Sequence, residues 1–218
     1  MKITTIGPVY PYRGGIAHYA AMLVRALEQA GHSVQMISFK RQYPSWLYPG
    51  ETDKDPSGAP YTTPAEFILD PLYPWTWAEA VRKVRQFQPD LVITHWWTTF
   101  WALPFAWMTA RFKRAGLKTM YLIHNVLPHE QRPFDKILAK FALKKGDAFI
   151  AQTPVEIERL QKLIPGANAS LCLLPLYTLF TGSIVPKAEA RKASGLPETG
   201  TILLFFGIIR PYKGLGYL

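Results

Sequence analysis

The sequence predicts a doubly wound α/β fold, in which helices cover both faces of a parallel β-sheet. Short apolar runs alternate with segments of helical periodicity through most of the chain. The apolar runs are continuous, as in strands that are buried on both faces. Glycine or proline closes several of the helical segments. Together these three observations are typical of a parallel sheet with crossover helices.

The first part of the chain follows this alternation and then leaves it. Residues 2–7, "KITTIG", predict a strand, residues 15–30 predict a helix, and residues 33–39, "SVQMISF", predict a second strand. Gly31 follows the helix as a residue that ends it. Between residues 43 and 77, seven prolines interrupt any regular pattern. Because this segment is also rich in aromatic residues, we expect a lid or a surface for an apolar ligand there.

After residue 77 the alternation resumes. The pattern predicts helices over about 77–87, 101–115 and 134–145, and strands in "DLVITHW" (90–96), "KTMYLIHN" (118–125) and "DAFIAQ" (147–152). A further helix begins at Thr153-Pro154-Val155-Glu156, which fits a capping box with proline in the first helical position. Pro165 and Gly166 end it.

One stretch raises the alternative of a membrane span. Residues 91–110 contain no charged side chain and are long enough to cross a bilayer. His95, four threonines and Pro104 interrupt the stretch, however, and its first residues have the pattern of a strand. We therefore favour a buried strand, loop and helix over a transmembrane helix.

The composition changes near the end of the chain. We predict a Rossmann-like domain over residues 1–178 and a polar interdomain linker with one short helix over 179–200. Residues 201–206 then predict a strand, followed by a basic loop and the start of a helix. We expect residues 201–218 to be the first strand and loop of a second, truncated α/β domain.

Cysteine content and charge restrict the functional classes. A single cysteine and the absence of a secretory pattern indicate a reducing, cytoplasmic environment. Between residues 78 and 145, twelve Lys or Arg stand against four acidic residues, which accounts for +8 of the formal net charge of +10. This excess is either a set of solvated helix faces or a surface for an anionic partner. No nucleic-acid-binding signature is present, and the nearby Trp and Phe residues favour an anionic membrane surface.

Three loops that follow predicted strands could carry chemistry, because ligands of parallel sheets bind at the carboxyl ends of the strands. In the first loop, Gly14 and Gly15 precede a helix, where backbone N–H groups can face an anion. The alternative is a simple turn, since neither the dinucleotide fingerprint nor a Walker loop is present.

The second loop contains His124 and Asn125 at a strand end, where they could bind a polyol or stabilise developing charge. His95 is a second strand-end histidine. A buried structural histidine and a metal ligand are the alternatives for His124, but His129 and Glu130 lack the spacing of the common zinc motif. No G-x-S-x-G elbow or paired-cysteine motif occurs, which disfavours a hydrolase or a zinc enzyme.

The third loop carries Arg210 and Lys213 between a predicted strand and a predicted helix. Two cations beside helix-terminal amides suit a diphosphate. The alternative is a solvated basic turn.

Taken together, the sequence resembles the N-terminal half of the family 4 retaining glycosyltransferases of the GT-B fold. The resemblance covers nearly the whole chain except residues 43–77. It rests on "PYRGGIA", "AGHSV", "QPDLV", "IHNVLPHE", "LLPLYTLF" and "LFFGIIRPYKGL" in this order.

The resemblance implies roles for individual residues. Gly14 and Gly15 match the glycine loop that approaches the donor phosphates, and Lys213 matches the lysine that binds the donor diphosphate. His124 matches the histidine near the transferred sugar and is the candidate catalytic residue. Arg210 stands three residues after the usual place of the arginine, as in a subfamily variant. We assign the acceptor side to Tyr12, Arg13, His95 and Asn125.

The implied reaction moves a sugar from a nucleotide-diphosphate sugar to an acceptor with retention of configuration, and it requires neither a metal nor another cofactor. We expect a glycan or lipid-linked acceptor of the cell envelope or of a polysaccharide, handled at the inner face of the cell membrane. Residues 201–218 would begin the nucleotide-sugar-binding domain. The family's Glu-x7-Glu segment would lie beyond residue 218, so we expect that the chain alone does not catalyse the transfer.

Two other readings stay open at this point. The chain could be a non-catalytic module that binds a glycan, a lipid or a partner with its half of the cleft that the two domains of the family form. It could also be a nucleotide-binding regulatory domain of the flavodoxin-like type.

Overall fold

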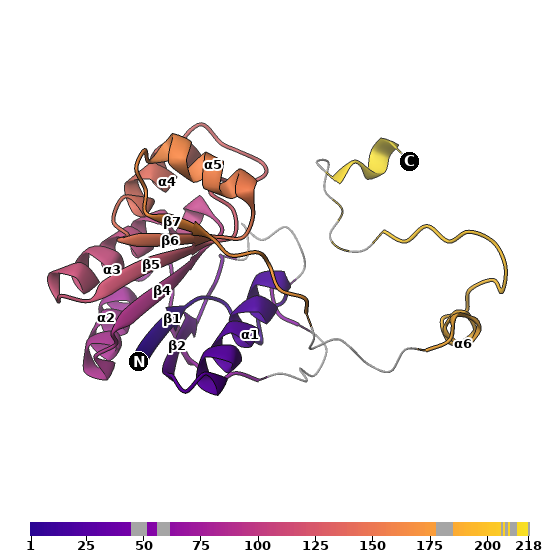
Figure 1. The fold of residues 1–218 in the computed structure, drawn as a ribbon, viewed down its shortest axis with the longest axis horizontal. Coiled ribbons are helices and arrows are strands. Elements are labelled where there is room, and N and C mark those ends of the chain that lie inside the picture. The colour runs from indigo at the N-terminus through magenta and orange to yellow at the C-terminus, as the bar shows by residue number, and fades with distance from the viewer. Residues whose placement is uncertain are drawn as a thin grey trace. The chain divides into compact units, whose positions relative to one another are not determined.

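A single parallel β-sheet of seven strands organises the first 174 residues (Figure 1). The computed structural model describes residues 1–44, 52–55, 62–177, 185–205, 207, 209 and 213–217. The strand order is β3-β2-β1-β4-β5-β6-β7, and all six strand pairs are parallel. The strands are β1 (Lys2–Ile6), β2 (Ser33–Phe39), β3 (Glu66–Leu69), β4 (Leu91–Trp96), β5 (Lys118–Ile123), β6 (Ala148–Ala151) and β7 (Ala169–Leu171).

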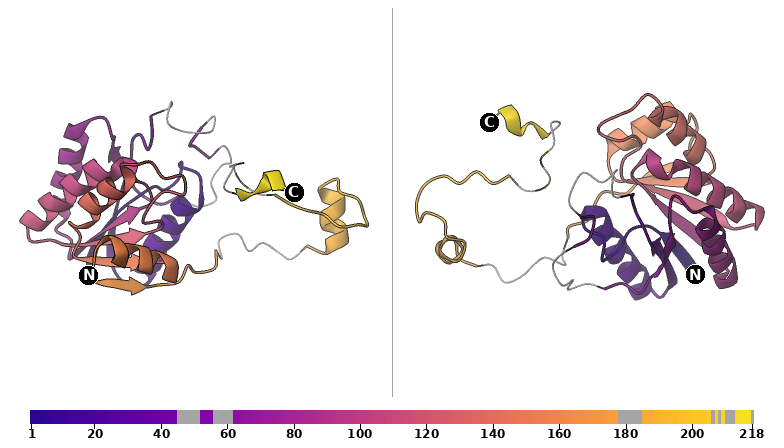
Figure 2. Two further views of the ribbon diagram at one scale, coloured as in Figure 1. Left: turned by 90° about the horizontal axis from the view of Figure 1, so that it is seen from above. Right: turned by 180° about the vertical axis from the view of Figure 1, so that it is seen from behind.

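Helices connect the strands and cover both faces of the sheet (Figures 1 and 2). Helix α1 lies on one face, and α2 and α3 lie together on the other, as right-handed crossovers require when the chain winds outward in both directions from the centre of the sheet. The helices of this unit are α1 (Gly15–Gln29), α2 (Pro74–Phe87), the short 3₁₀ helix η2 (Thr99–Trp101), α3 (Ala102–Arg114), α4 (Asp135–Leu143) and α5 (Pro154–Leu163).

The predicted fold class is confirmed. The predicted capping signal at the start of α5 is also present, since the side chain of Thr153 accepts a hydrogen bond from the N–H of Glu156. Two strands were not predicted. β3, with four residues, lies inside the proline-rich segment, and β7 has only three residues. Both are edge strands, which are too short for an alternation pattern to show in the sequence.

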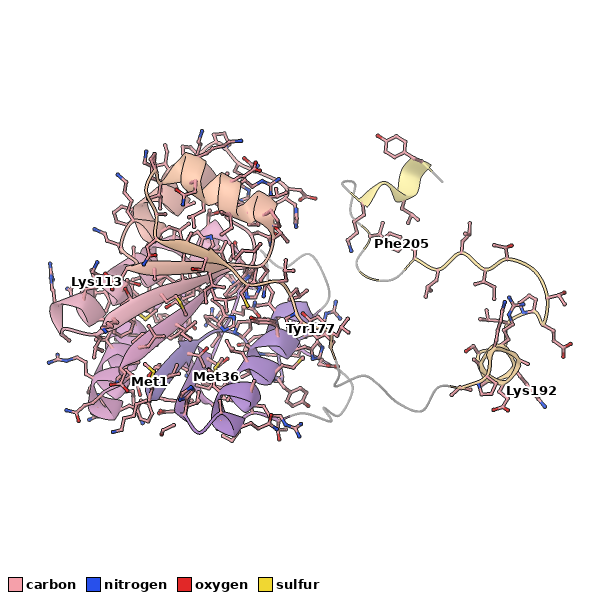
Figure 3. The ribbon with its side chains drawn as sticks, in the orientation of Figure 1. Met1, Met36, Lys113, Tyr177, Lys192 and Phe205 are labelled. Carbon is pink, nitrogen blue, oxygen red and sulfur yellow. The ribbon has the colours of Figure 1, made fainter. Side chains whose placement is uncertain are left out.

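The uncharged stretch 91–110 forms β4, η2 and most of α3, as predicted, and supplies much of the core. Trp96 and Trp101 are fully buried, and the ring of Trp101 stacks on Phe105 with 5.4 Å between centroids. Among the described residues, no helix has the length and apolar character needed to cross a membrane. Figure 3 shows side chains crowded around the sheet, with Met36 among them and Lys113 near the end of α3.

Residues Pro175–Leu218 form a second unit. Its described residues contain the helix α6 (Lys187–Ala193), in the region predicted to hold one short helix, and the 3₁₀ helix η5 (Leu215–Tyr217). The guanidinium of Arg191 organises the turn after α6, because it donates to the carbonyl oxygens of Pro197, Glu198 and Gly200 at 2.7–2.9 Å.

The strand predicted over residues 201–206 is wrong for residues 201–205, and Phe206 lies outside the described residues. Residues 201–205 are described and have no strand conformation. A strand of a parallel sheet is held by hydrogen bonds to neighbouring strands, and no strand pairs with residues 201–205 here. Their apolar pattern therefore finds no partner within the described chain.

Candidate functional site

A diagonal row of polar side chains crosses four neighbouring strands near their carboxyl ends. In the sheet register, Thr5 of β1 pairs with Ile93 of β4. Side chains two positions apart along a strand point to the same face of a sheet. His95, two residues beyond Ile93, therefore lies on the same face as Thr5 and one step nearer the carboxyl edge.

The same step repeats on the next two strands. His95 pairs with Leu122 of β5, and His124 lies two residues beyond Leu122. Leu122 in turn pairs with Ile150 of β6, and Gln152 lies two residues beyond Ile150. Each residue of the row thus shares a face with the residue before it. We call Thr5, His95, His124 and Gln152 the histidine row.

Hydrogen bonds link the histidine row from end to end. The hydroxyl of Thr5 lies 3.2 Å from Nε2 of His95, and Nδ1 of His95 lies 3.0 Å from Nε2 of His124. Nδ1 of His124 lies 3.1 Å from Oε1 of Gln152. The two imidazole rings are stacked, with 5.3 Å between their centroids. Both nitrogens of each imidazole are therefore engaged inside the protein.

The row is consistent with two neutral imidazoles. Because Oε1 of Gln152 accepts, Nδ1 of His124 must carry a proton, so Nε2 accepts from Nδ1 of His95. Nε2 of His95 then accepts from the hydroxyl of Thr5. Burial lowers the pKa of His124 to about 4, against a partial opposing effect of its hydrogen bond with Gln152. Burial, and then the nearby His124, lower the pKa of His95 well below its usual range.

Close packing fixes the position of the row. The ring of Tyr19 in α1 meets both imidazoles edge-on, with its centroid 6.1 Å from that of His95 and 5.5 Å from that of His124. Gly7, directly after β1, leaves room for His95, since a Cβ on Gly7 would lie 2.8 Å from Cδ2 of the imidazole. The backbone N–H of His124 donates to the carbonyl of Trp96 at 2.8 Å and continues the sheet by one bond.

The far end of the row has an unused donor. Nε2 of Gln152 is buried and has no hydrogen-bond partner among the described residues. A buried donor without a partner costs free energy, about 1–3 kcal/mol in general. An oxygen atom of a ligand could accept this bond. The row therefore combines neutral imidazoles with one unsatisfied amide at the edge where parallel sheets bind ligands.

The predicted glycine loop leads into α1 at the same edge. Gly14 precedes the helix with a φ of 111°. Glycine adopts this backbone conformation readily, whereas any residue with a Cβ would be strained in it. Apart from its chain neighbours, no atom of the described residues lies within 4 Å of the place where a Cβ would stand on Gly14, so the requirement for glycine comes from the backbone and not from packing. Gly15 is the first residue of α1. The positive end of the helix dipole thus faces the carboxyl edge.

The residues predicted for the acceptor side differ in exposure. Tyr12 is 1% exposed, donates its hydroxyl to the carbonyl of Phe39 at 2.7 Å, and has its pKa raised chiefly by burial. His95 is fully buried in the histidine row. Arg13 is exposed and Asn125 is half-buried. The contacts seen for Tyr12 and His95 are with the protein itself, and the acceptor role of all four residues stays a prediction.

The predicted diphosphate cations lie in the second unit. Nζ of Lys213 is 5.6 Å from the ring centroid of Phe205 and 3.0 Å from the place where a Cβ would stand on Gly207. Arg210 lies outside the described residues. Gly14 and Gly15 belong to the first unit and Lys213 to the second, and the diphosphate role of all of these residues stays a prediction.

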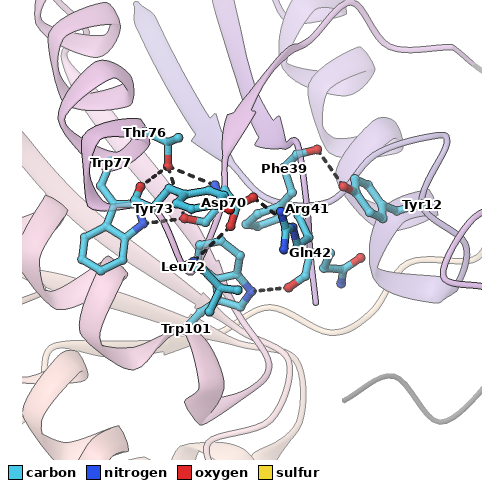
Figure 4. Close-up of polar contacts among 10 residues, drawn as sticks. All are labelled: Tyr12, Phe39, Arg41, Gln42, Asp70, Leu72, Tyr73, Thr76, Trp77 and Trp101. Atoms are coloured by element: carbon cyan, nitrogen blue, oxygen red, sulfur yellow. Dashed lines mark hydrogen bonds and ion pairs between the residues drawn. The ribbon is translucent and has the colours of Figure 1, made fainter. Parts of the chain in front are cut away.

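A polar network joins the end of β2 to the described part of the predicted lid segment, residues 43–77, of which 45–51 and 56–61 lie outside the described residues (Figure 4). Asp70, directly after β3, is buried and forms an ion pair with Nε of Arg41 at 3.0 Å. Its carboxylate also accepts from the N–H of Leu72, and its carbonyl accepts from the indole of Trp77 at 2.7 Å. The indole of Trp101 donates to the carbonyl of Gln42 and ties the chain after β2 to the core.

Sequence reasoning named both histidines but missed Thr5 and Gln152. Gln152 was visible as a polar residue at a strand end, in the same position relative to its strand as His124. Thr5 lies inside a strand and gave no such signal. Among the described residues, no three His, Cys, Asp or Glu side chains gather as a group that could hold a metal ion.

Comparison with solved structures finds chains of similar fold. UDP-GlcNAc 2-epimerase from Methanocaldococcus jannaschii matches with a TM-score of 0.51 and 14% identity, over 78% of this chain and 45% of that one. An alpha-glucosyltransferase in complex with UDP and a 13-mer DNA matches with a TM-score of 0.50 and 9% identity, over 88% and 45%. Sucrose-phosphate synthase from Thermosynechococcus elongatus has a TM-score of 0.47 and 17% identity, over 82% and 90%.

The epimerase and glucosyltransferase matches show a similar fold and nothing more specific, and the chain spans less than half the length of those two chains. None of the curated proteins compared with the chain matches it. The model of the "Glycosyl transferase 4-like domain" family, however, matches residues 14–176. This match begins at the glycine loop and includes the strand-end histidines. The chain therefore belongs to the glycosyl transferase 4-like domain family, as its motifs predicted.

Proposed function

We propose that this chain is the acceptor-binding part of a glycosyltransferase that moves a hexosyl group from a nucleotide-diphosphate sugar with retention of configuration. The observation that carries the proposal is the common placement of the glycine loop and His124 at the carboxyl edge, within the region that matches the family. Ligands of Rossmann-like sheets bind at this edge. The alpha-glucosyltransferase of similar fold was solved with UDP, which is consistent with a nucleotide-sugar donor.

The proposed chemistry needs stabilisation of charge on the departing diphosphate. Lys213, Arg210 and the N-terminus of α1 would supply this without a metal or a cofactor, because fixed cations and aligned amides can do so. The histidine row would keep His124 neutral and oriented beside the transferred sugar. To reach a sugar hydroxyl, His124 would exchange its bond with His95 or with Gln152 for one with the substrate.

The acceptor that we propose is a glycan or lipid-linked glycan of the cell envelope, handled by a cytoplasmic protein at the inner membrane surface. Helix α4 supports this part. Phe134, Ile137 and Phe141 lie at helical spacing and are 69%, 68% and 48% exposed. Three exposed lysines flank this apolar stripe, Lys136, Lys140 and Lys144. An exposed apolar stripe with flanking lysines suits an anionic bilayer.

Vesicle sedimentation tests the membrane part. We expect the chain to bind vesicles that contain phosphatidylglycerol and to release as the salt concentration rises. Ile137→Asp should weaken binding about tenfold, since it places a negative charge in the stripe. Val155→Asp is the matched control, because Val155 is also exposed but lies in the first turn of α5. Equal loss in both variants would contradict a role for α4.

Activity measurements test the transferase part. We expect residues 1–218 alone to release no nucleotide diphosphate from UDP-glucose or from other nucleotide sugars. A polypeptide that continues this chain through a donor-binding domain should transfer the sugar, and NMR of the product should show the anomeric configuration of the donor.

His124→Ala should lower kcat at least about tenfold, the range of a positioned polar group near the reacting centre. His32→Ala, in the turn before β2, is the control. A product of inverted configuration would contradict the proposal.

A further inference from the structure

A recess lies on the face of the sheet that α2 and α3 cover, while the histidine row packs against α1 on the other face. The recess has a volume of about 470 Å³ and lies between α2 and α3. Its lining residues are Ala78, Val81, Arg82, Arg85, Gln86, Trp107 and Arg111. Helix α2 starts near the carboxyl edge, after β3, and ends near the amino edge, before β4. Because Arg82, Arg85 and Gln86 lie in its second half, the recess is nearer the amino edge than the candidate active site.

Three guanidinium groups surround this recess. Arg82 and Arg85 come from α2 and Arg111 comes from α3. No ion pair joins any of the three to a carboxylate in the described part of the chain. The nearby Glu66, whose pKa Arg82 helps to lower, is paired with Lys83 at 2.8 Å. Three like charges at one recess repel each other, and a bound anion would relieve that repulsion.

The guanidinium groups are partly oriented. The guanidinium of Arg111 lies over the ring of Trp107, 4.4 Å from its centroid. One nitrogen of Arg82 donates to Oε1 of Gln86 at 3.3 Å, one helical turn away. A planar guanidinium that is already held presents its remaining N–H groups to an anion at a smaller entropy cost, and its fork matches phosphate oxygens.

The rest of the lining is apolar. Val81 is buried and Ala78 is exposed, and the ring of Trp107 meets that of Trp77 edge-on at 6.3 Å. The recess therefore presents cations together with an aromatic and aliphatic surface. We propose that it binds a phosphate group that is joined to an apolar chain, as in a lipid phosphate. The phosphate would lie among the three guanidinium groups and the apolar part along Val81 and Trp107.

Calorimetric titration of the chain tests this site with two probes, inorganic phosphate and dihexanoyl phosphatidic acid below its micelle concentration. We expect the phosphatidic acid to bind at least about tenfold more tightly than inorganic phosphate, since several buried CH₂ groups add to its affinity. Arg85→Gln should weaken both ligands about tenfold, the effect of losing one charge-assisted bond. Trp107→Leu should weaken the phosphatidic acid more than inorganic phosphate, because it removes apolar surface as well as the ring that orients Arg111.

Arg25→Gln is the matched control, because it removes one exposed arginine from α1 on the other face of the sheet. Unchanged affinity in this variant would support the site. Equal weakening by Arg25→Gln and Arg85→Gln would show general charge attraction and overturn it. Equal affinity for the two probes would overturn the apolar part of the ligand and indicate a free phosphate. Absence of binding by either probe would overturn the proposal as a whole.

Discussion

His124 makes the stability of the protein depend on pH. Its pKa is about 4 in the folded protein, against an ordinary value of 6.5. Between these values the unfolded chain holds a proton that the folded chain does not, so the free energy of unfolding falls as the pH falls from 6.5 to 4. The contribution of His124 is on the order of 3 kcal/mol. Urea unfolding at several pH values should show this loss, and His124→Gln should lose less stability over the same range. Equal slopes for both proteins would contradict the burial of a neutral imidazole.

The histidine row should require glycine at position 7 because of close packing, although the φ of Gly7 is not in the left-handed region. Gly7→Ala would place a Cβ within 2.8 Å of the His95 ring, so we expect a loss of about 1–3 kcal/mol from overpacking. Adding His95→Ser should recover part of this loss, because it removes the ring. Denaturant unfolding of the two single variants and the double variant measures the coupling between the two positions. Additive effects would mean that the ring does not limit residue 7.

Single residues show where sequence reasoning reached its limit. His95 and His124 were identifiable because each stands at the end of an apolar run. The direct contact between the two histidines was not identifiable from the sequence, because it depends on the register of β4 and β5. The pattern of side chains alone does not determine that register. Gly14 and Gly15 were predicted to precede a helix, and α1 begins at Gly15. Tyr12 packs against Phe39 in the core, a contact that the sequence did not indicate, and its acceptor role stays a prediction.

At the scale of elements, the start of α5 gives a measurable prediction. Thr153 caps the helix, and Glu156 in its first turn accepts a bond from the N–H of Val126, in the loop after His124. Thr153→Ala should lower the free energy of unfolding by about 1 kcal/mol, because one first-turn N–H loses its partner. Thr153→Ser keeps the oxygen and should cost less than half as much. Chemical denaturation of the three proteins compares them, and an equal loss in both variants would point to the methyl group instead of the cap.

The elements themselves were predictable to the extent that they are long and bounded by clear signals. Helix α3 was expected over about 101–115 and spans Ala102–Arg114, since glycine ends it and its apolar positions repeat at helical spacing. β3 was not predicted because prolines surround it and it is held by pairing with β2 and by the Asp70 network. Such tertiary contacts override local sequence preference.

At the scale of the whole molecule, the fold class followed from alternation because a crossover between parallel strands usually contains a helix. The domain division proposed from composition stays a prediction, with the two units of the structure meeting at residues 174 and 175. Residues 201–205 show why local pattern was insufficient there. An apolar run specifies a strand only when a neighbouring strand accepts its hydrogen bonds, and such a neighbour is a property of the whole molecule.

Hydrogen exchange distinguishes these two kinds of apolar run. Amides of β4 and β5, which lie inside the sheet and are hydrogen-bonded on both sides, should exchange at least about a thousandfold more slowly than in an unfolded peptide. Amides of residues 202–205 should exchange within about tenfold of the unfolded rate, because no strand pairs with them in the described structure. Mass spectrometry of peptides from the two regions measures both rates in one experiment, so each serves as the reference for the other. Strong protection of residues 202–205 would mean that the predicted strand does form, and that its partner lies elsewhere than in the sheet described above.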